Sequence, residues 1–254
     1  MGGWYHAGII MSSQQATSIV DVELLAGRIG SVRERIARAA RRVGRDPADV
    51  TLVAVTKGFP AEVVRGAAEC GLAVFGESRV QEARAKIPLV GREGLTWHLV
   101  GPLQRNKVKY CFGLFDLIHS VDSVALAEEI ERRAAARDTV VDVLLEVNVA
   151  GEASKHGIAP DEALEAARAV GRLGRVRLGG LMTMPPLVDD PEENRGHFQA
   201  LRLLRGEIAQ AGIEGVEMTH LSMGMSGDFE VAVEEGATLV RVGTAVFGPR
   251  EVHR

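Results

Sequence analysis

The sequence predicts a single closed (β/α)8 barrel preceded by one additional helix. From residue 51 onward, short apolar runs alternate with helix-like stretches, and this alternation is typical of a parallel sheet covered by helices. The chain has 254 residues, the usual length of one such barrel, and it carries eight of these runs. No G-x-G-x-x-G motif follows the first run, which disfavours an open dinucleotide-binding sheet.

The additional helix is expected over Ile19–Val43, where apolar residues recur at helical spacing and arginines lie on the opposite face. We expect residues 1–15 to be a flexible extension and residues 16–254 to form one domain, because no linker rich in Gly, Pro or Ser divides the chain. The predicted strands are Thr51–Thr56, Ala73–Phe75, Thr96–Val100, Leu114–His119, Val140–Val149, Arg177–Leu181, Val216–Leu221 and Thr238–Val242. The predicted helices between them are Pro60–Glu69, Arg79–Lys86, Ser123–Ala136, Pro160–Leu173, Glu192–Ala211 and Asp228–Glu235.

The amino-acid composition disfavours several classes of binding partner. A net charge of −4 provides no electrostatic footprint for nucleic acid or an anionic membrane, and 4% aromatic residues disfavour base stacking. Cys70 and Cys111 have no metal-type spacing, and no H-x-x-x-H motif or carboxylate–histidine cluster predicts a metal site. We expect reduced thiols in a cytoplasmic, monomeric protein without membrane spans.

Lys57 closes the apolar run TLVAVTK and is followed at once by Gly58, Phe59 and Pro60. In barrels of this kind the chemistry lies at the C-terminal ends of the strands. A lysine at the end of a buried strand is expected to have a partly desolvated amine, which suits formation of a Schiff base. The alternative is a strand-end lysine whose ammonium simply reaches solvent.

Polar and small residues gather at the predicted C-terminal ends of the other strands. They are Glu77 and Ser78, His98 and Gly101, His119 and Ser120, Asn148, Met182 and Thr183, Ser222, and Arg241 with Gly243 and Thr244. His98 is expected to be structural, with its ring bonded to a loop carbonyl.

The loops after the seventh and eighth strands carry the strongest signal, in the segments LSMGMSGDF and VRVGTAVFG. These loops commonly form a phosphate site that uses backbone N–H groups and a helix N-terminus. The candidate donors are Ser222, the amides of Met223 and Gly224, Gly243 and Thr244. Arg241 is expected to pair either with a phosphate or with a ring nitrogen. A lysine facing such a site suits a phosphorylated aldehyde, and pyridoxal phosphate is the ligand we expect.

Taken together, the motifs resemble those of the pyridoxal phosphate homeostasis proteins (the YggS/PROSC-like family). The resemblance extends from about residue 20 onward and rests on TLVAVTK, FGESRVQEA, WHLVGPLQRNK, HSVDS, LLEVNVAGEASKHG, LGGLMTMPP and LSMGMSGDFEVAVEEGATLVRVGTAVFG. It implies a barrel similar to the N-terminal domain of alanine racemase. It also implies that Lys57 is the Schiff-base lysine and that the loops at Ser222 and Arg241 hold the cofactor phosphate. The family usually carries Asn where this chain has Ser78, whose shorter side chain puts that contact with the ring in doubt.

Three functions are compatible with this pattern. The first is a non-catalytic protein that stores, buffers or delivers pyridoxal phosphate to apoenzymes. The second is an amino-acid racemase dependent on the same cofactor, which needs an acid/base group on each face of the substrate. The chain has two tyrosines, Tyr5 and Tyr110, and neither falls at a strand end. The third is a Schiff-base aldolase without cofactor, for which no proton shuttle stands beside Lys57. The first function is the one we expect.

Overall fold

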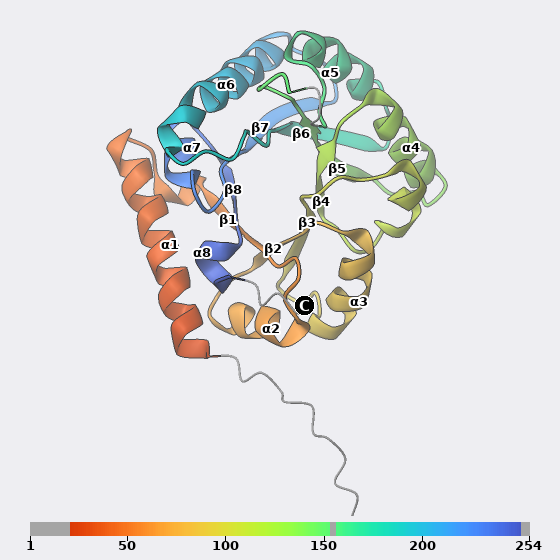
Figure 1. The fold of residues 1–254 in the computed structure, drawn as a ribbon. Helices are drawn as coiled ribbons and strands as arrows, with labels where there is room; N and C mark the ends of the chain where they lie inside the picture. The colour runs from red at the N-terminus through yellow and green to blue at the C-terminus, as the bar shows by residue number, and fades with distance from the viewer. Residues whose placement is uncertain (1–20, 153–155, 250–254) are drawn as a thin grey trace, which may run out of the picture.

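The chain folds into a closed barrel of eight parallel strands arranged in chain order, shown in Figure 1. The computed structural model describes residues 21–152 and 156–249, so the predicted extension at residues 1–15 lies outside the described residues. Closure is made by β1 (Thr51–Val55) and β8 (Leu239–Val242), which pair in parallel along their length. The predicted fold class is therefore confirmed.

The remaining strands begin and end close to their predicted bounds. They are β2 (Val74–Glu77), β3 (Thr96–Leu99), β4 (Leu117–Val121), β5 (Val141–Glu146), β6 (Val176–Met182) and β7 (Val216–Ser222). Two bounds differ by about three residues, because β5 was predicted to end at Val149 and β4 was predicted to begin at Leu114. Leu114 and Phe115 instead lie in a turn closed by hydrogen bonds to the Cys111 carbonyl, and their side chains pack on the outer core.

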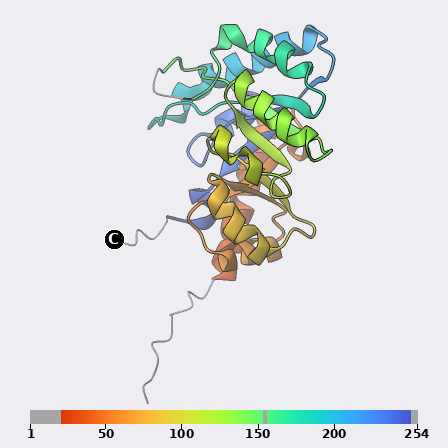
Figure 2. The same cartoon turned by 90° about the vertical axis from the view of Figure 1, so that its right-hand side faces the viewer.

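Helices surround the barrel on its outside, and Figure 2 shows the side covered by α3 and α4. The α-helices are α1 (Val22–Arg42), α2 (Ala61–Glu69), α3 (Val80–Val90), α4 (Val124–Ala135), α5 (Ala163–Gly171), α6 (Arg195–Gln210), α7 (Phe229–Glu234) and α8 (Thr244–Phe247). The 3-10 helices are η1 (Pro47–Asp49), η2 (Arg105–Tyr110), η3 (Pro160–Glu162) and η4 (Pro191–Asn194). The short α8 was not predicted from the sequence.

The predicted additional helix is α1, which packs against α7, α8 and α2 along one side of the barrel (Figure 1). Its buried face is formed by Leu25, Ile29, Val32 and Ile36, a spacing that places one apolar stripe toward the core. Asp21 caps its N-terminus by accepting a hydrogen bond from the Leu24 N–H at 2.9 Å. Helix α1 therefore covers the outside of the seam where β8 meets β1.

Side chains alternate between two apolar layers along each strand. In β1, Leu52 and Ala54 belong to the layer between barrel and helices, whereas Val53 and Val55 belong to the cluster inside the barrel. Continuing this alternation past Val55 assigns Lys57 to the inward set at the C-terminal end of the barrel. Within the described ranges, no helix combines the length and the apolar character that a bilayer span requires.

Candidate functional site

A cavity of about 250 Å³ opens at the C-terminal ends of the strands. Five of the residues singled out in the sequence line it together, and they are Lys57, Ser78, Arg241, Gly243 and Thr244. They come from the first, second and eighth strand ends, positions far apart in the sequence. The closed barrel alone brings these residues to one place, because its strand ends form a ring.

Lys57 lies in this cavity, but its side chain is exposed to solvent. The expectation of a partly desolvated amine is therefore wrong. The physical reason is the length of β1, which ends at Val55, so that Lys57 lies two residues beyond the sheet in a turn. Gly58 completes this turn with a φ of 77°, a left-handed conformation that glycine adopts at little cost.

Ser78 occupies the equivalent inward position after β2 and is half-buried. The loop after β3 presses directly against it. A Cβ atom added to Gly101 would lie 2.3 Å from the Ser78 carbonyl oxygen, which explains why a glycine is required there. This contact holds the backbone of Ser78 at the edge of the cavity.

Arg241 forms part of the cavity wall and is only 4% exposed. Its Nη1 donates to the Ser222 hydroxyl at 2.6 Å, and its Nη2 donates to the Thr183 carbonyl at 2.8 Å. Burial lowers the pKa of Arg241 to about 10, although Glu146 and Asp228 act in the opposite direction. The guanidinium thus remains charged at neutral pH and brings a positive charge to the wall of the cavity.

Two buried histidines inside the barrel continue the series of hydrogen bonds that begins with Arg241 and Ser222. His119 Nδ1 lies 2.8 Å from Ser222 Oγ, and His119 Nε2 lies 3.0 Å from His98 Nδ1. Burial lowers the pKa of His98 to about 4 and lowers the pKa of His119 well below its usual value, so both rings are neutral at pH 7.

A guanidinium can only donate, so Arg241 donates to the Ser222 hydroxyl. That hydroxyl keeps its own O–H and a second lone pair for the contact with His119, and the direction of the two histidine contacts is set by the ring tautomers. His98 is structural as predicted, but its partner is His119 and not a loop carbonyl. The chain of four groups holds Arg241 in one orientation.

The loop after β7 turns sharply at Gly224, whose φ is 90°. A Cβ atom there would lie 2.5 Å from the Ala232 Cβ, so only glycine allows the loop to approach α7. Asp228 accepts a hydrogen bond from the Met225 N–H at 2.6 Å, and Ser226 Oγ accepts one from the Ala245 N–H at 3.2 Å. The second contact ties this loop to the start of α8.

The five other predicted site residues do not line the cavity. Met182 is buried in the apolar cluster inside the barrel, and Ser222 lies behind Arg241. The side chain of Met223 packs in the outer core, and its N–H already donates to the Leu239 carbonyl at 3.1 Å. Asn148 donates to the Glu152 carbonyl at 2.9 Å within its own loop. Gly224 shapes the loop through its backbone, as described above.

Sequence reasoning missed several residues of the cavity wall. Ser226 and Gly227 belong to the loop after β7, and the Ser-Gly pair in LSMGMSGDF is a turn signal that could have identified them. Met184 and Leu187 reach the cavity from the loop after β6, and Phe59 reaches it from the loop after β1. No local pattern marks these three apolar residues, because their loops carry no periodicity.

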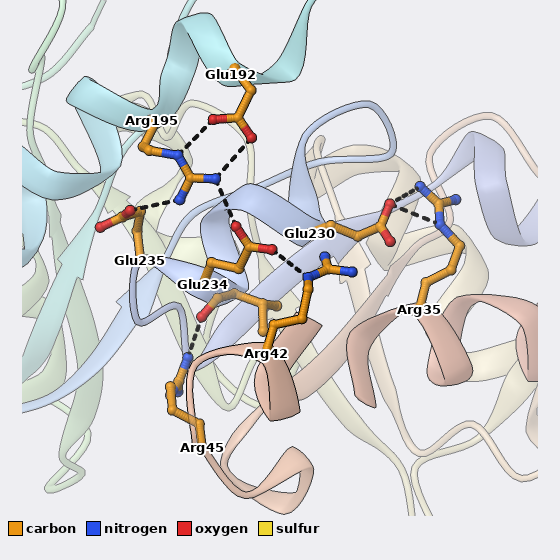
Figure 3. Close-up of polar contacts among 9 residues, drawn as sticks. Arg35, Arg42, Arg45, Glu192, Arg195, Glu230, Glu234 and Glu235 are labelled. Carbon is orange, nitrogen blue, oxygen red and sulfur yellow. Dashed lines mark hydrogen bonds and ion pairs between the residues drawn. The ribbon is translucent and has the colours of Figure 1, made fainter. Parts of the chain in front are cut away.

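Charged side chains hold α7 from outside the barrel, as Figure 3 shows. We call them the α7 network, and they are Arg35 and Arg42 of α1, Glu192, Arg195, and Glu230, Glu234 and Glu235. The Arg42–Glu234, Arg195–Glu234 and Arg195–Glu235 pairs are 2.7, 2.7 and 2.8 Å long. The network joins α1 and α6 to the helix that follows the β7 loop.

The groups in the cavity fit a small phosphorylated aldehyde. Lys57 supplies an amine, Arg241 a buried positive charge, and Ser226 and Thr244 hydroxyl groups from the loops after β7 and β8. The N–H of Thr244, the first residue of α8, has no acceptor inside that helix. Val55 and Val100 form an apolar wall against which a ring could lie.

Comparisons with known proteins agree with this arrangement. The family described as "Alanine racemase, N-terminal domain" matches residues 28–251. The "Pyridoxal phosphate homeostasis protein" of Aquifex aeolicus is 47% identical over 224 residues, covering 88% of this chain and 97% of the relative. The protein of the same name from Pseudomonas aeruginosa is 41% identical over 227 residues, covering 89% and 96%.

A solved structure is similar in fold and in sequence. PipY of Synechococcus elongatus, with PLP bound, superposes with a TM-score of 0.76 at 38% identity, covering 88% of this chain and 100% of PipY. These matches extend over nearly the whole barrel and its mouth. The chain therefore belongs to the pyridoxal phosphate homeostasis protein family, which has the barrel fold of the alanine racemase N-terminal domain.

Proposed function

We propose that the chain binds pyridoxal 5'-phosphate at the barrel mouth and takes part in cofactor homeostasis, by storing, buffering or delivering it. The observation that carries the proposal is the shared cavity of Lys57, Arg241 and the loops at Ser226 and Thr244. PipY, a relative of the same fold, has PLP bound. When bound, the cofactor supplies an aldehyde that can form a Schiff base with a lysine amine.

In this proposal Lys57 holds the cofactor covalently, and the loops after β7 and β8 hold its phosphate. Gly243, Thr244, Ser226 and Gly227 line the phosphate side, while Arg241 provides positive charge from the wall. Ser222 acts through Arg241, to which it is hydrogen-bonded at 2.6 Å. Ser78, on the loop after β2, faces the ring.

We further propose that the bound cofactor is held and not used for turnover. The described side chains of the cavity are an amine, a guanidinium, hydroxyls and apolar groups, whereas two-base racemisation needs acid/base groups on both faces. Tyr110 lies in η2 and packs against Arg84 and Lys109, and Tyr5 lies outside the described residues. We also propose that the protein is a cytoplasmic monomer that supplies the cofactor to apoenzymes. The free thiols of Cys70 and Cys111 suit that compartment.

The test is to add pyridoxal phosphate, record the visible absorbance, reduce with borohydride and map the labelled peptide. The yellow colour should appear, and the label should be on Lys57. The variant Lys57→Ala should lose both signals, whereas Lys109→Ala, which changes an exposed lysine beside Tyr110, should keep them. A protein that stays colourless, or a label on another lysine, would refute the proposal.

The racemase alternative makes a different prediction. It requires stereospecific exchange of the α-proton of an amino acid, abolished in Lys57→Ala. We expect no such exchange in deuterated water when it is followed by NMR.

A further inference from the structure

A buried cluster of charged side chains lies outside the barrel, directly behind the turn that carries Lys57. We call it the Lys86 cluster, and it consists of Thr56, Glu77, Glu82 and Lys86. Lys86 is 6% exposed and Glu77 is fully buried. Charged side chains are almost never buried in this way unless they are paired, because leaving water is costly. The cavity groups described above leave this cluster without a role.

The ammonium of Lys86 uses all three of its N–H groups. It donates to the Thr56 carbonyl at 2.7 Å, to Glu77 Oε1 at 2.6 Å and to Glu82 Oε1 at 2.8 Å. An ammonium has three donors and no acceptor, so its hydrogen-bonding capacity is filled. Lys86 and Glu82 are four residues apart on α3, whereas Glu77 is the last residue of β2. The cluster thus joins a strand, a helix and the end of β1.

Two of these contacts reach the backbone on either side of Lys57. The Thr56 carbonyl before it is held by Lys86, and the Gly58 N–H after it donates to Glu82 Oε1 at 2.6 Å. The Thr56 hydroxyl also donates to Glu77 Oε1 at 2.5 Å. The peptide groups that flank the lysine are therefore tied to α3 and β2, while its own side chain is exposed.

A purely stabilising role does not explain this arrangement well. Apolar side chains of similar size usually stabilise a buried position as well as an ion pair does, or better. Apolar side chains, however, could not accept from the Gly58 N–H or donate to the Thr56 carbonyl. The hydrogen bonds that require polar side chains are therefore those to the backbone of Thr56 and Gly58.

Resting on the proposed function, we propose that Lys86 is a positioning residue for Lys57. With Glu77 and Glu82 it fixes the backbone of the turn. The Lys57 side chain is thereby anchored at a backbone position that faces the cavity. The covalent bond to an aldehyde forms when the Lys57 amine adds to the carbonyl carbon and one water leaves. A turn that samples other conformations lowers the fraction of time in which the amine can reach that carbon.

The test uses two ligands that differ at one carbon. Pyridoxal phosphate carries the aldehyde, whereas pyridoxine 5'-phosphate has the same ring and phosphate but an alcohol, which cannot form the covalent bond. In Lys86→Met and in Glu82→Ala, the Kd for pyridoxal phosphate measured by absorbance should rise roughly tenfold or more. The Kd for pyridoxine 5'-phosphate, measured by calorimetry, should change by less than about twofold, because it depends on the loops after β7 and β8.

The two variants and one control keep the result interpretable. Glu82 is 28% exposed, so Glu82→Ala leaves the buried Lys86–Glu77 pair intact and should fold even where Lys86→Met does not. Lys109→Met, which changes an exposed lysine on η2, should alter neither affinity. The rate of borohydride trapping on Lys57 should fall in parallel with the affinity for the aldehyde.

Three outcomes would overturn the inference in distinguishable ways. Unchanged affinity for pyridoxal phosphate in both variants refutes the positioning role alone. An equal loss for both ligands assigns the cluster to general stability and also refutes it. A wild-type protein that binds pyridoxine 5'-phosphate but is never trapped on Lys57 refutes the covalent part of the proposed function, and the positioning role with it.

Discussion

Two groups of charged side chains support the barrel mouth from outside, and they differ in their exposure to water. The Lys86 cluster lies behind the turn after β1, with Lys86 6% exposed and Glu77 fully buried. The α7 network lies behind the loop after β7, and its arginines are more exposed, with Arg35 and Arg195 at 32% and 30%, although the Glu235 side chain is only 10% exposed. The pairs in the two groups have similar lengths, so geometry alone would rank them as equal.

The difference in exposure separates their energetic roles. In the Lys86 cluster every donor of one ammonium has a single acceptor, and the loss of Lys86 leaves the Glu77 carboxylate buried without its cation. In the α7 network Glu234 pairs with both Arg42 and Arg195, and Glu235 pairs with Arg195 and Arg202. Water and a second partner can replace any one of these contacts. The buried group is therefore specific and vulnerable, whereas the exposed group is redundant.

The largest expected effect comes from breaking the buried group. Lys86→Met should lower the free energy of unfolding by about 3–5 kcal/mol, because the Glu77 carboxylate remains buried without its cation. Urea titration followed by circular dichroism measures the change. The double variant Lys86→Met/Glu77→Leu should recover much of the loss, since it removes both charges together. A loss below about 1 kcal/mol in the single variant would contradict this prediction, because the Lys86 cluster would then contribute no more than the α7 network does.

The dependence on pH should distinguish the two groups by sign. Burial raises the pKa of Glu77 above 4.5, against the lowering effect of Lys86. For Glu235, burial alone would raise the pKa, but hydrogen bonds from Arg195 and Gln199 outweigh it and lower the pKa below 4.5. A raised pKa means that the folded state binds more protons than the unfolded state, and a lowered pKa means the reverse.

The stability of the wild type relative to Glu77→Gln should therefore fall as pH rises from 4.5 through the folded pKa of Glu77. Its stability relative to Glu235→Gln should instead fall as pH decreases from 4.5 through the folded pKa of Glu235. Urea titrations between pH 3 and pH 8 provide both difference curves. Two curves with slopes of the same sign would contradict the contrast between the groups.

The comparison also shows what the sequence could and could not predict. The barrel, the ring of strand ends and the cavity position of Lys57, Arg241 and Thr244 follow from the alternation of apolar runs. The Lys86 cluster does not, because Glu77 was grouped with the polar residues at the strand ends and no local pattern pairs it with Lys86. Their pairing depends on how α3 packs against β2, which is a tertiary contact. The exposure of Lys57, which the sequence left as an alternative, has a related cause, since the end of β1 is set by its neighbours and not by its own apolar run.

The smallest expected effects belong to the α7 network. Arg42→Ala should change the free energy of unfolding by no more than about 0.5 kcal/mol, because Glu234 keeps its pair with Arg195. Arg195→Ala removes the contacts to Glu192, Glu234 and Glu235 together and should cost about 1 kcal/mol.

Urea titrations at 0.05 M and 1 M NaCl should show both losses shrinking with salt, because exposed pairs are screened. The loss in Lys86→Met should stay nearly constant over the same range, since salt does not enter a dry cluster. A salt-independent loss of several kcal/mol of unfolding free energy in Arg195→Ala would contradict this prediction. It would mean that the number of partners, and not burial, decides how much a charged cluster stabilises the fold.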